Sequence, residues 1–478
     1  MRNDHQPAPG RHLKWLAPLL ALVLLVLTGA PALAAGGGGV GFVPPVWTII
    51  PFIGILLSIA LFPLFAHHFW EHHYPKISFF WLVLAIIFMA VSLPSDIGFG
   101  EAFGAKFFVT YEEYIAFIIL LGSLFVISGG IYISGDLQGH PVTNSVIILI
   151  GSLLASVIGT TGAAMLLIRP IIRANANRKH NLHVILFFIF LVCNIGGSLT
   201  PIGDPPLFLG FLQGIPFEWT LALTPHWAFT VLVVLAIFYA YDMYLYRKEG
   251  LKPAGKGAPI RIEGLPNFAL LLGVVGLVIF SGVWHPETTI PFFGLGQLHL
   301  PALVRDGGQI VLALISLKIT SQRIRESNEF NYEPIKEVAY LFIGIFTAMI
   351  PALMLLNARG GELGLTSPAH YFWATGILSS FLDNAPTYLT FLATAQGALG
   401  IEQAIGMTTD PAAEQILIGI SAGAVFMGAM TYIGNGPNFM VKAIAENSGI
   451  KMPSFFGYLA YSMIVLLPVL ILLTVLFF

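Results

Sequence analysis

Long apolar runs separated by short polar loops occupy most of the 478-residue chain. Continuous apolar runs of about 18 residues or more are typical of membrane-spanning helices, whereas transmembrane β-strands alternate apolar and polar residues over about ten positions. The runs here are continuous, so the pattern predicts an all-α polytopic membrane protein. We place them at 45–66, 78–96, 112–133, 143–170, 183–201, 221–246, 266–283, 303–320, 336–358, 368–398, 413–434 and 453–478.

The first 35 residues have the pattern of an export signal. Arg11 and Lys14 precede an apolar run from Trp15 to Leu27, and the small residues at 32–35 follow. A basic start, an apolar stretch and a small-residue cleavage site are the three parts of a signal peptide. A signal anchor that is not cleaved begins in the same way, so both alternatives stay open.

Basic residues are unevenly distributed among the loops. The segments 169–182, 247–263 and 318–336 are rich in Lys and Arg, and we expect them to face the cytoplasm. The segment 399–412 contains Glu402 and Asp410 but no Lys or Arg, so it should lie on the opposite side.

Two apolar segments begin and end on the same side under this orientation. Segment 143–170 lies between cytoplasmic loops, and segment 368–398 lies between loops on the opposite side. Such a segment is a re-entrant hairpin, which a membrane protein tolerates only where the backbone is buried in protein or lines a watery cavity. The sequence therefore predicts about 10 full spans plus two re-entrant hairpins that enter from opposite sides.

The two halves of the chain resemble each other in three places. Gly122 pairs with Gly344, residues 156–162 pair with 380–386, and residues 200–206 pair with 431–437. Because segments 112–133 and 336–358 would cross in opposite directions, these are inverted-topology repeats, which are typical of secondary transporters. We divide the chain into 1–35 (signal peptide or signal anchor), 36–111 (N-terminal spans), 112–246 (first inverted repeat), 247–335 (linker and connecting spans) and 336–478 (second inverted repeat).

Glycine and proline interrupt both repeats at corresponding places, within 159–162, 194–206, 383–387 and 434–438. Glycine frees the backbone and proline removes a donor, so each helix stops and restarts, and such broken helices indicate a site near the membrane midplane. Their oxygen ligands suit a hard cation such as Na⁺, and their helix N-termini suit an anion. The neutral candidate ligands are Thr160, Thr161, Asn194, Thr200, Asn384, Thr387 and Asn435.

Two carboxylates, Asp204 and Asp383, lie inside these breaks. A charge at membrane depth is costly and is by default a functional hypothesis. Either carboxylate could bind a cation, or take a proton when empty, so the two ligands would compete. The alternative is that each Asp caps the half-helix that follows it. We favour the functional interpretation for both.

Composition and charge narrow the possible functions. Of the residues, 56% are hydrophobic and only 10% are charged, with a net charge of -2. Soluble domains carry about 25% charged residues, so a soluble enzyme is excluded, and the near-neutral balance argues against nucleic acid as a partner. The single cysteine, Cys193, rules out a disulfide within the chain. The sequence contains no P-loop, nucleophile elbow or zinc-protease motif, so we expect neither an enzyme nor a resident cofactor.

Two further polar groups lie near the ends of apolar runs. The first is the histidine cluster of His67, His68, His72 and His73. Its spacing could hold a metal on a helix, but histidines at the end of a span commonly settle at the membrane interface, so we predict no metal site and leave its role open. Glu112 and Glu113 precede an apolar run, and we expect them to face water.

The strings NIGGSLTPIGDPP (194–206) and SSFLDNAP (379–386) resemble motifs of the ion transporter superfamily, which includes sodium/proton antiporters, arsenite permeases and citrate or dicarboxylate carriers. The resemblance covers about 110–478 and implies a scaffold domain beside a transport domain with two hairpins and two broken helices. It places the site at the hairpin tips and breaks, and adds Asn438 to the residues above. Dicarboxylate carriers typically show Ser-Asn-Thr at both tips. This chain has Gly-Thr-Thr and Asp-Asn-Ala instead. Its Gly-Asp-Pro and Leu-Asp-Asn-x-Pro elements are closer to the antiporter and arsenite-permease relatives.

The leading hypothesis is a secondary active transporter that exchanges Na⁺ for H⁺ through its intramembrane Asp residues. The alternative is a proton- or sodium-coupled carrier of an organic anion such as citrate, with arsenite ranked below it. An aspartyl protease dyad is disfavoured because Asp383 corresponds to Gly159, and Asp204 to Asn435. We expect a multi-pass protein of the cell inner membrane. Its partners would be lipid and small ions or a small-molecule substrate; the stoichiometry and the oligomeric state, including a homodimer, stay open.

Overall fold

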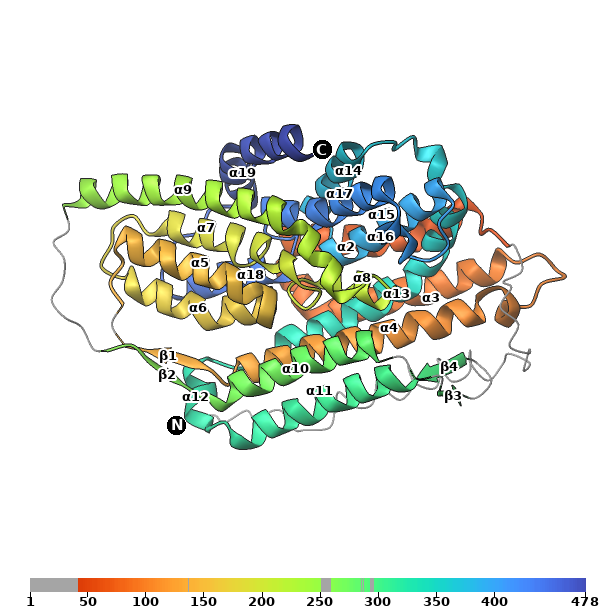
Figure 1. The fold of residues 1–478 in the computed structure, drawn as a ribbon, viewed down its shortest axis with the longest axis horizontal. Coiled ribbons are helices and arrows are strands. Elements are labelled where there is room, and N and C mark those ends of the chain that lie inside the picture. Colours follow the sequence, from red (N-terminus) through yellow and green to blue (C-terminus); the bar gives the residue numbers. More distant parts are fainter. Residues whose placement is uncertain (1–41, 136, 251–258, 285, 287, 293–295) are drawn as a thin grey trace.

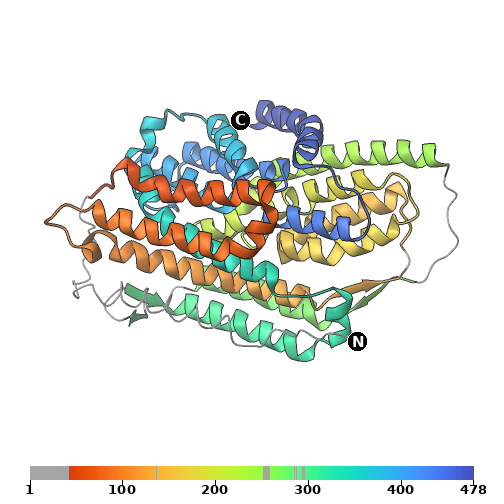
Figure 2. The ribbon, with the colours of Figure 1, turned by 180° about the vertical axis from the view of Figure 1, so that it is seen from behind.

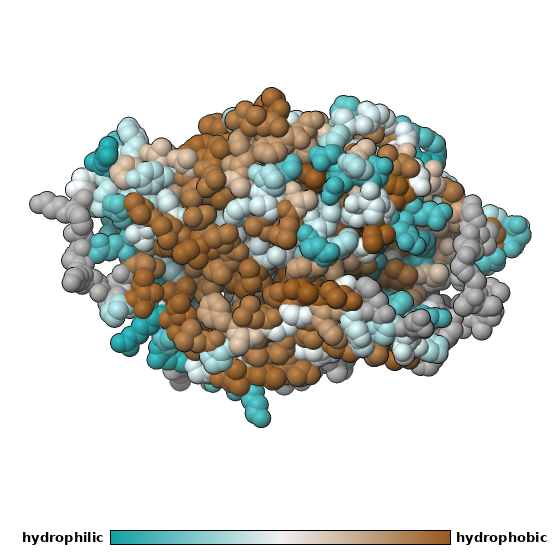
Figure 3. All heavy atoms as spheres, in the orientation of Figure 1, coloured by the Kyte–Doolittle hydropathy of each residue, from teal (hydrophilic) through white to brown (hydrophobic). Residues whose placement is uncertain are grey.

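The computed structural model describes residues 42–135, 137–250, 259–284, 286, 288–292 and 296–478. The segment 1–35, for which we expect an export signal or anchor, lies outside the described residues. Within the described part, 11 helices are long and apolar enough to cross a membrane. Apolar residues cover most of the middle of the face in Figure 3, and hydrophilic residues gather mainly toward its two ends. The expected all-α polytopic membrane architecture is confirmed.

One set of helices packs side by side and is called the scaffold helices below. It comprises η1 (Val46–Ile49), α2 (Ile50–Phe65), α3 (His67–Val91), α4 (Phe99–Ser128), α10 (Pro266–Val283), α11 (Leu300–Ile319) and α13 (Glu333–Arg359). Figure 1 shows α10 and α11 beside α4 along one edge of the molecule, and Figure 2 shows α2 and α3 from behind.

Each repeat contains a long helix, a hairpin, a broken helix and a second long helix, in that order. In the first repeat these are α4, then α5 (Pro141–Ile158) and α6 (Thr160–Ala174), then α7 (Leu182–Leu191), η2 (Ile195–Leu199) and α8 (Pro205–Leu212), and finally η3 (Phe217–Leu223) and α9 (Thr224–Glu249). In the second repeat they are α13 with η4 (Gly360–Leu363), then α14 (Pro368–Phe381) and α15 (Asn384–Leu399), then α16 (Gly406–Thr409), α17 (Pro411–Met427), η5 (Gly428–Met430) and α18 (Gly436–Asn447), and finally α19 (Phe455–Phe477).

We call α5 and α6 hairpin 1, and α14 and α15 hairpin 2. Residues 192–204 are the first break and residues 428–435 the second break. The two hairpins lie toward opposite ends of the molecule in Figure 1. The sequence explains these interruptions. Gly159, at the tip of hairpin 1, has a φ of 80°, and Pro205 and Pro437 lie in the first turns of α8 and α18, which follow the two breaks. Each of the two segments that lead into the breaks is 89% buried, against 22% for α10, so the broken helices form the centre.

Short elements close the two ends of the bundle. Strand β1 (Tyr132–Ser134) pairs antiparallel with β2 (Arg261–Glu263), with Tyr132 opposite Glu263. Strand β3 (Thr289–Phe292) pairs with β4 (Gly296–His299), and α12 (Gln322–Ser327) connects α11 to α13. The β1–β2 pair lies at the end that carries the basic loops, which we call the basic end, and β3–β4 lies at the opposite end (Figure 1).

Two helices begin well before the apolar runs that predicted them. α3 begins at His67 rather than near 78, and α4 begins at Phe99 rather than near 112. A hydropathy pattern marks the part of a helix that matches the hydrocarbon layer, whereas the backbone hydrogen bonds continue into its polar ends. In the first turns of α3, His72 Nδ1 lies 2.8 Å from the His68 carbonyl oxygen. Among the described residues, no group of three His, Cys, Asp or Glu side chains could hold a metal.

The expectation that Glu112 and Glu113 precede a span and face water is wrong. Both lie inside α4 and are half-buried, because the helix already starts at Phe99. The Glu113 carboxylate accepts a hydrogen bond of 2.7 Å from Gln213 Nε2, at the end of α8. This contact joins a scaffold helix to the first broken helix.

Candidate functional site

Four half-helices begin at the centre of the molecule. Their N-cap residues are Gly159 before α6, Asp204 before α8, Asp383 before α15 and Asn435 before α18. The first hairpin tip contacts the first break directly, because the Thr160 amide donates to the Gly203 carbonyl at 2.9 Å. Each helix N-terminus carries about half a positive charge. The backbone therefore creates a positive electrostatic potential here without any Lys or Arg.

Equivalent hydrogen bonds brace the two breaks against the two hairpins. The Thr200 hydroxyl donates to the Ser156 carbonyl, and the Thr431 hydroxyl donates in the same way to the Ser380 carbonyl. Ser156 Oγ in turn donates to the Gly196 carbonyl at 2.6 Å. Residues that correspond in the two repeats of the sequence thus make corresponding contacts in the structure. Sequence reasoning did not assign roles to the two serines or to Thr431, although all three lie in the matched runs.

Glycine is required where each break folds back on itself. A Cβ atom at Gly203 would lie 2.0 Å from the Gly197 carbonyl oxygen, and one at Gly434 would lie 2.5 Å from the Gly428 carbonyl oxygen. No side chain fits at such distances, so both repeats depend on the same close backbone approach.

Asp204 is the hub of the site. Its carboxylate accepts hydrogen bonds from Thr160 Oγ1 at 2.9 Å, from Asn384 Nδ2 at 2.6 Å and from Asn435 Nδ2 at 3.0 Å. These donors come from hairpin 1, hairpin 2 and the second break. The side chain is 1% exposed, and although it precedes α8 it makes no capping hydrogen bond. Three donors offset part of the cost of burying a charge, and the capping alternative does not describe this residue.

Asp383 behaves differently from Asp204. Its Oδ1 accepts a hydrogen bond of 3.0 Å from the Ala385 amide, so it caps α15. The residue is half-buried rather than fully buried. Capping therefore accounts for the Asp383 contact in this structure, and the residue lies at the edge of the site.

Two amide oxygens at the site lack hydrogen-bond partners. Asn194 Nδ2 donates to the Ile189 carbonyl at 2.8 Å and to Asn438 Oδ1 at 2.7 Å, which leaves its Oδ1 buried and unpaired. Asn384 Oδ1 is likewise buried and unpaired. Because a carbonyl or carboxylate can only accept, these partners fix the orientation of both amides. A Cβ atom at Gly428 would lie 3.1 Å from Asn194 Oδ1 and 3.7 Å from Asn384 Nδ2, so the two amides flank one small space.

The remaining candidate residues lie around this centre. Asn438 Nδ2 donates to the carbonyls of Gly428 and Thr431, both at 2.9 Å, and thereby holds the second break. The hydroxyl of Thr387 donates to the Asp383 carbonyl at 2.8 Å. Thr161 follows Thr160 on α6 and is half-buried, outside this set of hydrogen bonds. The structure thus gathers Thr160, Asn384 and Asn435 on Asp204, and places Thr161, Asn194, Thr200, Asp383, Thr387 and Asn438 beside them.

The cationic side chains nearest to the breaks in the sequence, Arg169 and Lys442, have other partners. Arg169 on α6 forms an ion pair of 2.7 Å with Glu329. Lys442 on α18 pairs with Glu446 at 3.0 Å and lies 5.6 Å from the centre of the Tyr432 ring. The hydrogen bonds found for Asp204 all come from hydroxyl and amide groups, so the donors at the site are neutral.

Comparison with known proteins identifies relatives of this chain. Residues 43–478 match the model of a family described as "Putative citrate transport". Two proteins from Mycobacterium bovis and Mycobacterium tuberculosis, each described as an "uncharacterized transporter", are 25% identical over 340 residues, which is 67% of this chain and 73% of theirs. The family match spans both repeats and agrees with the resemblance to the ion transporter superfamily.

Proposed function

We propose that this chain, which belongs to the citrate-transport family that matches residues 43–478, is a secondary active transporter whose Asp204 binds the coupling cation. The observation that carries the proposal is the position of Asp204: a buried carboxylate on which both hairpin tips and the second break converge. A group that contacts both hairpins and both breaks can report its occupancy to every element that must move. We place the chain in the cell inner membrane as a multi-pass protein. There, coupling of transport to the cation requires such a link between the bound cation and the elements that move.

The ligand set favours a hard cation. Asp204 supplies carboxylate oxygens, and Asn384 adjoins it through a hydrogen bond of 2.6 Å. The side-chain oxygens of Asn384 and Asn194 are buried and unpaired. Oxygen ligands of this kind suit Na⁺, and the same carboxylate can take a proton when the metal ion leaves. Because one carboxylate cannot hold both, binding of Na⁺ displaces H⁺. Exchange of Na⁺ for H⁺ is the function that this geometry supports best.

A cation-coupled carrier of an organic anion such as citrate is the second candidate. Two observations favour it: the family match, and the convergence of four helix N-termini, whose amides bind carboxylate groups. In this alternative Asp204 still holds the coupling cation, while the anion binds at the positive N-terminus of α18, whose N-cap residue Asn435 is uncharged. Neither role requires Lys or Arg at the site.

A flux assay in proteoliposomes separates these functions. With an imposed pH gradient, we expect Na⁺ to drive proton movement when no organic acid is present, and Asp204→Asn to abolish it. The assay should be repeated with Li⁺, arsenite and citrate. Proton movement that appears only when citrate is added would support cation-coupled anion transport instead of Na⁺/H⁺ exchange. Proton movement at the wild-type rate in Asp204→Asn would refute the assignment of Asp204.

A further inference from the structure

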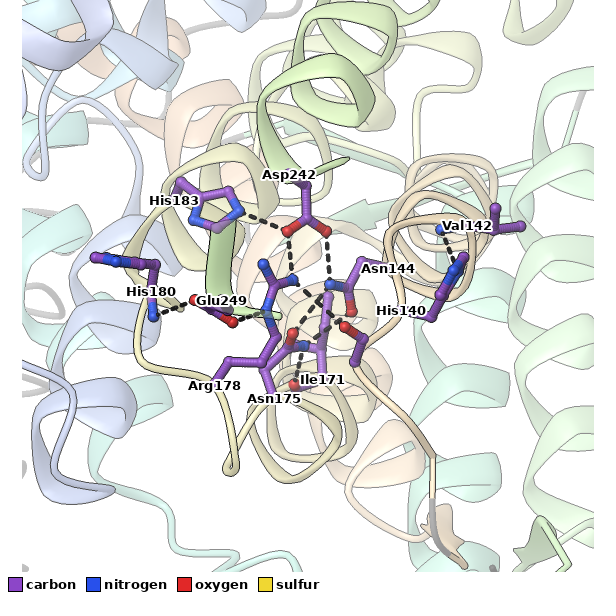
Figure 4. A network of polar contacts seen from close by, with 11 residues as sticks. His140, Val142, Asn144, Ile171, Asn175, Arg178, His180, His183, Asp242 and Glu249 are labelled. Atoms are coloured by element: carbon purple, nitrogen blue, oxygen red, sulfur yellow. Dashed lines mark hydrogen bonds and ion pairs between the residues drawn. The ribbon is translucent and has the colours of Figure 1, made fainter. Parts of the chain in front are cut away.

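Figure 4 shows a second buried polar cluster. It lies at the basic end, where α5 begins and α6 ends, whereas the tip of hairpin 1 lies at the Asp204 site. We call it the basic-end network. Its members come from both arms of hairpin 1, the loop after them, α7 and α9: Asn144, Asn175, Arg178, His183, Asp242 and Glu249. The transport site described above uses none of these residues.

Asp242 on α9 is the centre of the basic-end network. Its Oδ2 accepts a hydrogen bond of 2.9 Å from Asn144 Nδ2 on α5. Its Oδ1 forms an ion pair with Arg178, in the loop after α6, and lies 2.8 Å from His183 Nε2 on α7. Asp242 is 0% exposed. One carboxylate therefore joins α5, α7 and the end of hairpin 1 to α9, as the dashed contacts in Figure 4 show.

The two arms of hairpin 1 are also joined to each other at this level. Asn144 Nδ2 donates to Asn175 Oδ1 at 3.0 Å, and Asn175 Nδ2 donates to Asn144 Oδ1 at 2.8 Å. Arg178 Nε donates to Glu249 at 3.3 Å. The base of the hairpin is thus fixed both across its arms and against the long helix behind it.

Hairpin 2 cannot be held in the same way. Its counterpart of α9 is α19, and the sequence of α19 contains no Asp, Glu, Lys or Arg. The network therefore belongs to the hairpin whose tip supplies Thr160 to Asp204. Buried ion pairs contribute little net stability, because desolvation offsets their attraction, and in some proteins their role is to select one geometry among several.

We propose that Asp242 is a positioning residue for the coupling site: by fixing the base of hairpin 1 on α7 and α9, it sets where the tip places Thr160. The proposal rests on the proposed function. Helix α5 has 18 residues and is therefore about 27 Å long. A tilt of about 3° at its base moves the tip by ~1.4 Å over that length. Such a shift is enough to break the Thr160–Asp204 hydrogen bond of 2.9 Å.

The test is the substitution Asp242→Asn, which keeps the size of the side chain and removes its charge. We expect the apparent KM for the coupling cation to rise about 10-fold, as for other residues that orient an ion ligand, with a much smaller change in maximal rate. Arg178→Gln should act in the same direction. The double variant loses one positive and one negative charge, so the network keeps its wild-type net charge. It should recover part of the lost affinity, a result that would show that the two residues act together.

Asn267→Ala is the matched control. Asn267 on scaffold helix α10 is 1% exposed, donates to the Gly130 carbonyl and Thr320 Oγ1, both at 2.9 Å, and accepts from Ser316 Oγ at 2.6 Å. Its loss removes a comparable set of buried hydrogen bonds, none of which involves hairpin 1 or the basic-end network. We expect a lower melting temperature in detergent and an unchanged KM.

If Asp242→Asn does not fold, Asn144→Ala is measured in its place. Asn144→Ala releases only the α5 arm, so we expect it to raise the KM by a smaller factor than Asp242→Asn. A wild-type KM in either folded variant, with only the melting temperature lowered, would overturn the proposal and leave the network a packing feature. Asp204→Asn, measured in the same preparation, tests the proposed function separately. If it retains exchange, the proposed function is wrong whatever the Asp242 variants do.

Discussion

Replacing Asp204 with Asn removes one charge from the centre of the bundle and leaves the side chain almost the same size. The amide oxygen can still accept from Thr160 Oγ1 and Asn435 Nδ2, which both reach the same carboxylate oxygen. The new amide nitrogen faces Asn384 Nδ2, which now donates to the other oxygen at 2.6 Å. Rotation of the Asn384 amide by half a turn would convert this clash into a hydrogen bond.

The expected effect on stability is small and the expected effect on transport is complete. Losing one charge-assisted hydrogen bond costs about 1.5–3 kcal/mol. Removing a buried carboxylate returns a desolvation penalty that is itself several kcal/mol. The two contributions have opposite signs and similar size, so the free energy of unfolding should change little. A neutral amide cannot alternate between Na⁺ and H⁺, so coupled flux should disappear.

The assay therefore measures two quantities on one preparation. Sodium-driven acidification or alkalinisation is followed with a pH-sensitive dye in proteoliposomes, and the melting temperature is followed by intrinsic fluorescence in detergent. Loss of flux with an unchanged melting temperature supports the role of Asp204. Wild-type exchange in the folded variant refutes it, and a collapse of the melting temperature with lost flux would show that the carboxylate is structural.

Four further outcomes are expected. Asp383→Asn should keep the cap of α15 and measurable exchange, whereas Asp383→Ala should lower the free energy of unfolding by about 1 kcal/mol, as denaturation of the two variants will show. Lowering the pH should raise the apparent KM for Na⁺, because protons occupy the Asp204 carboxylate, and a KM that is flat with pH would contradict competition. Gly428→Ala places a methyl group 3.1 Å from an unpaired amide oxygen, so Na⁺ binding should weaken while the protein still folds; equal binding would remove this space from the site. Of single cysteines introduced at Asn181 and Gln403, only the second should react with an impermeant reagent from outside the cell, and equal labelling would contradict the inverted-hairpin topology.

The hairpins and breaks could be predicted from the sequence because glycine and proline act locally. Gly159 and the prolines in the first turns of α8 and α18 interrupt the backbone whatever surrounds them. The distribution of Lys and Arg among the loops then indicated which apolar segments begin and end on the same side and are therefore hairpins rather than spans. The extents of α3 and α4 were less predictable, since a polar helix end carries the same hydrogen bonds as an apolar one but no hydropathy signal.

The division of roles between the two aspartates could not be read from the sequence. Both are N-cap residues of half-helices, and only the direction of the side chain separates a cap from a hub. That direction depends on donors from three other elements. Asp242 did leave a signal, as a carboxylate inside the apolar run 221–246. Its partners were not predictable, because Asn144, Arg178 and His183 come from separate elements that meet only in the folded bundle.

The inverted repeats duplicate a backbone, but the site works only if their side chains differ. Asp204 and Asn435 occupy equivalent N-cap positions, and Asn435 Nδ2 donates to the Asp204 carboxylate at 3.0 Å. Two carboxylates at that separation would repel strongly, and one would have to take up a proton. The amide turns this repulsion into a hydrogen bond. The hub therefore contains a single carboxylate, which can change its charge by only one unit when the bound cation is exchanged for a proton.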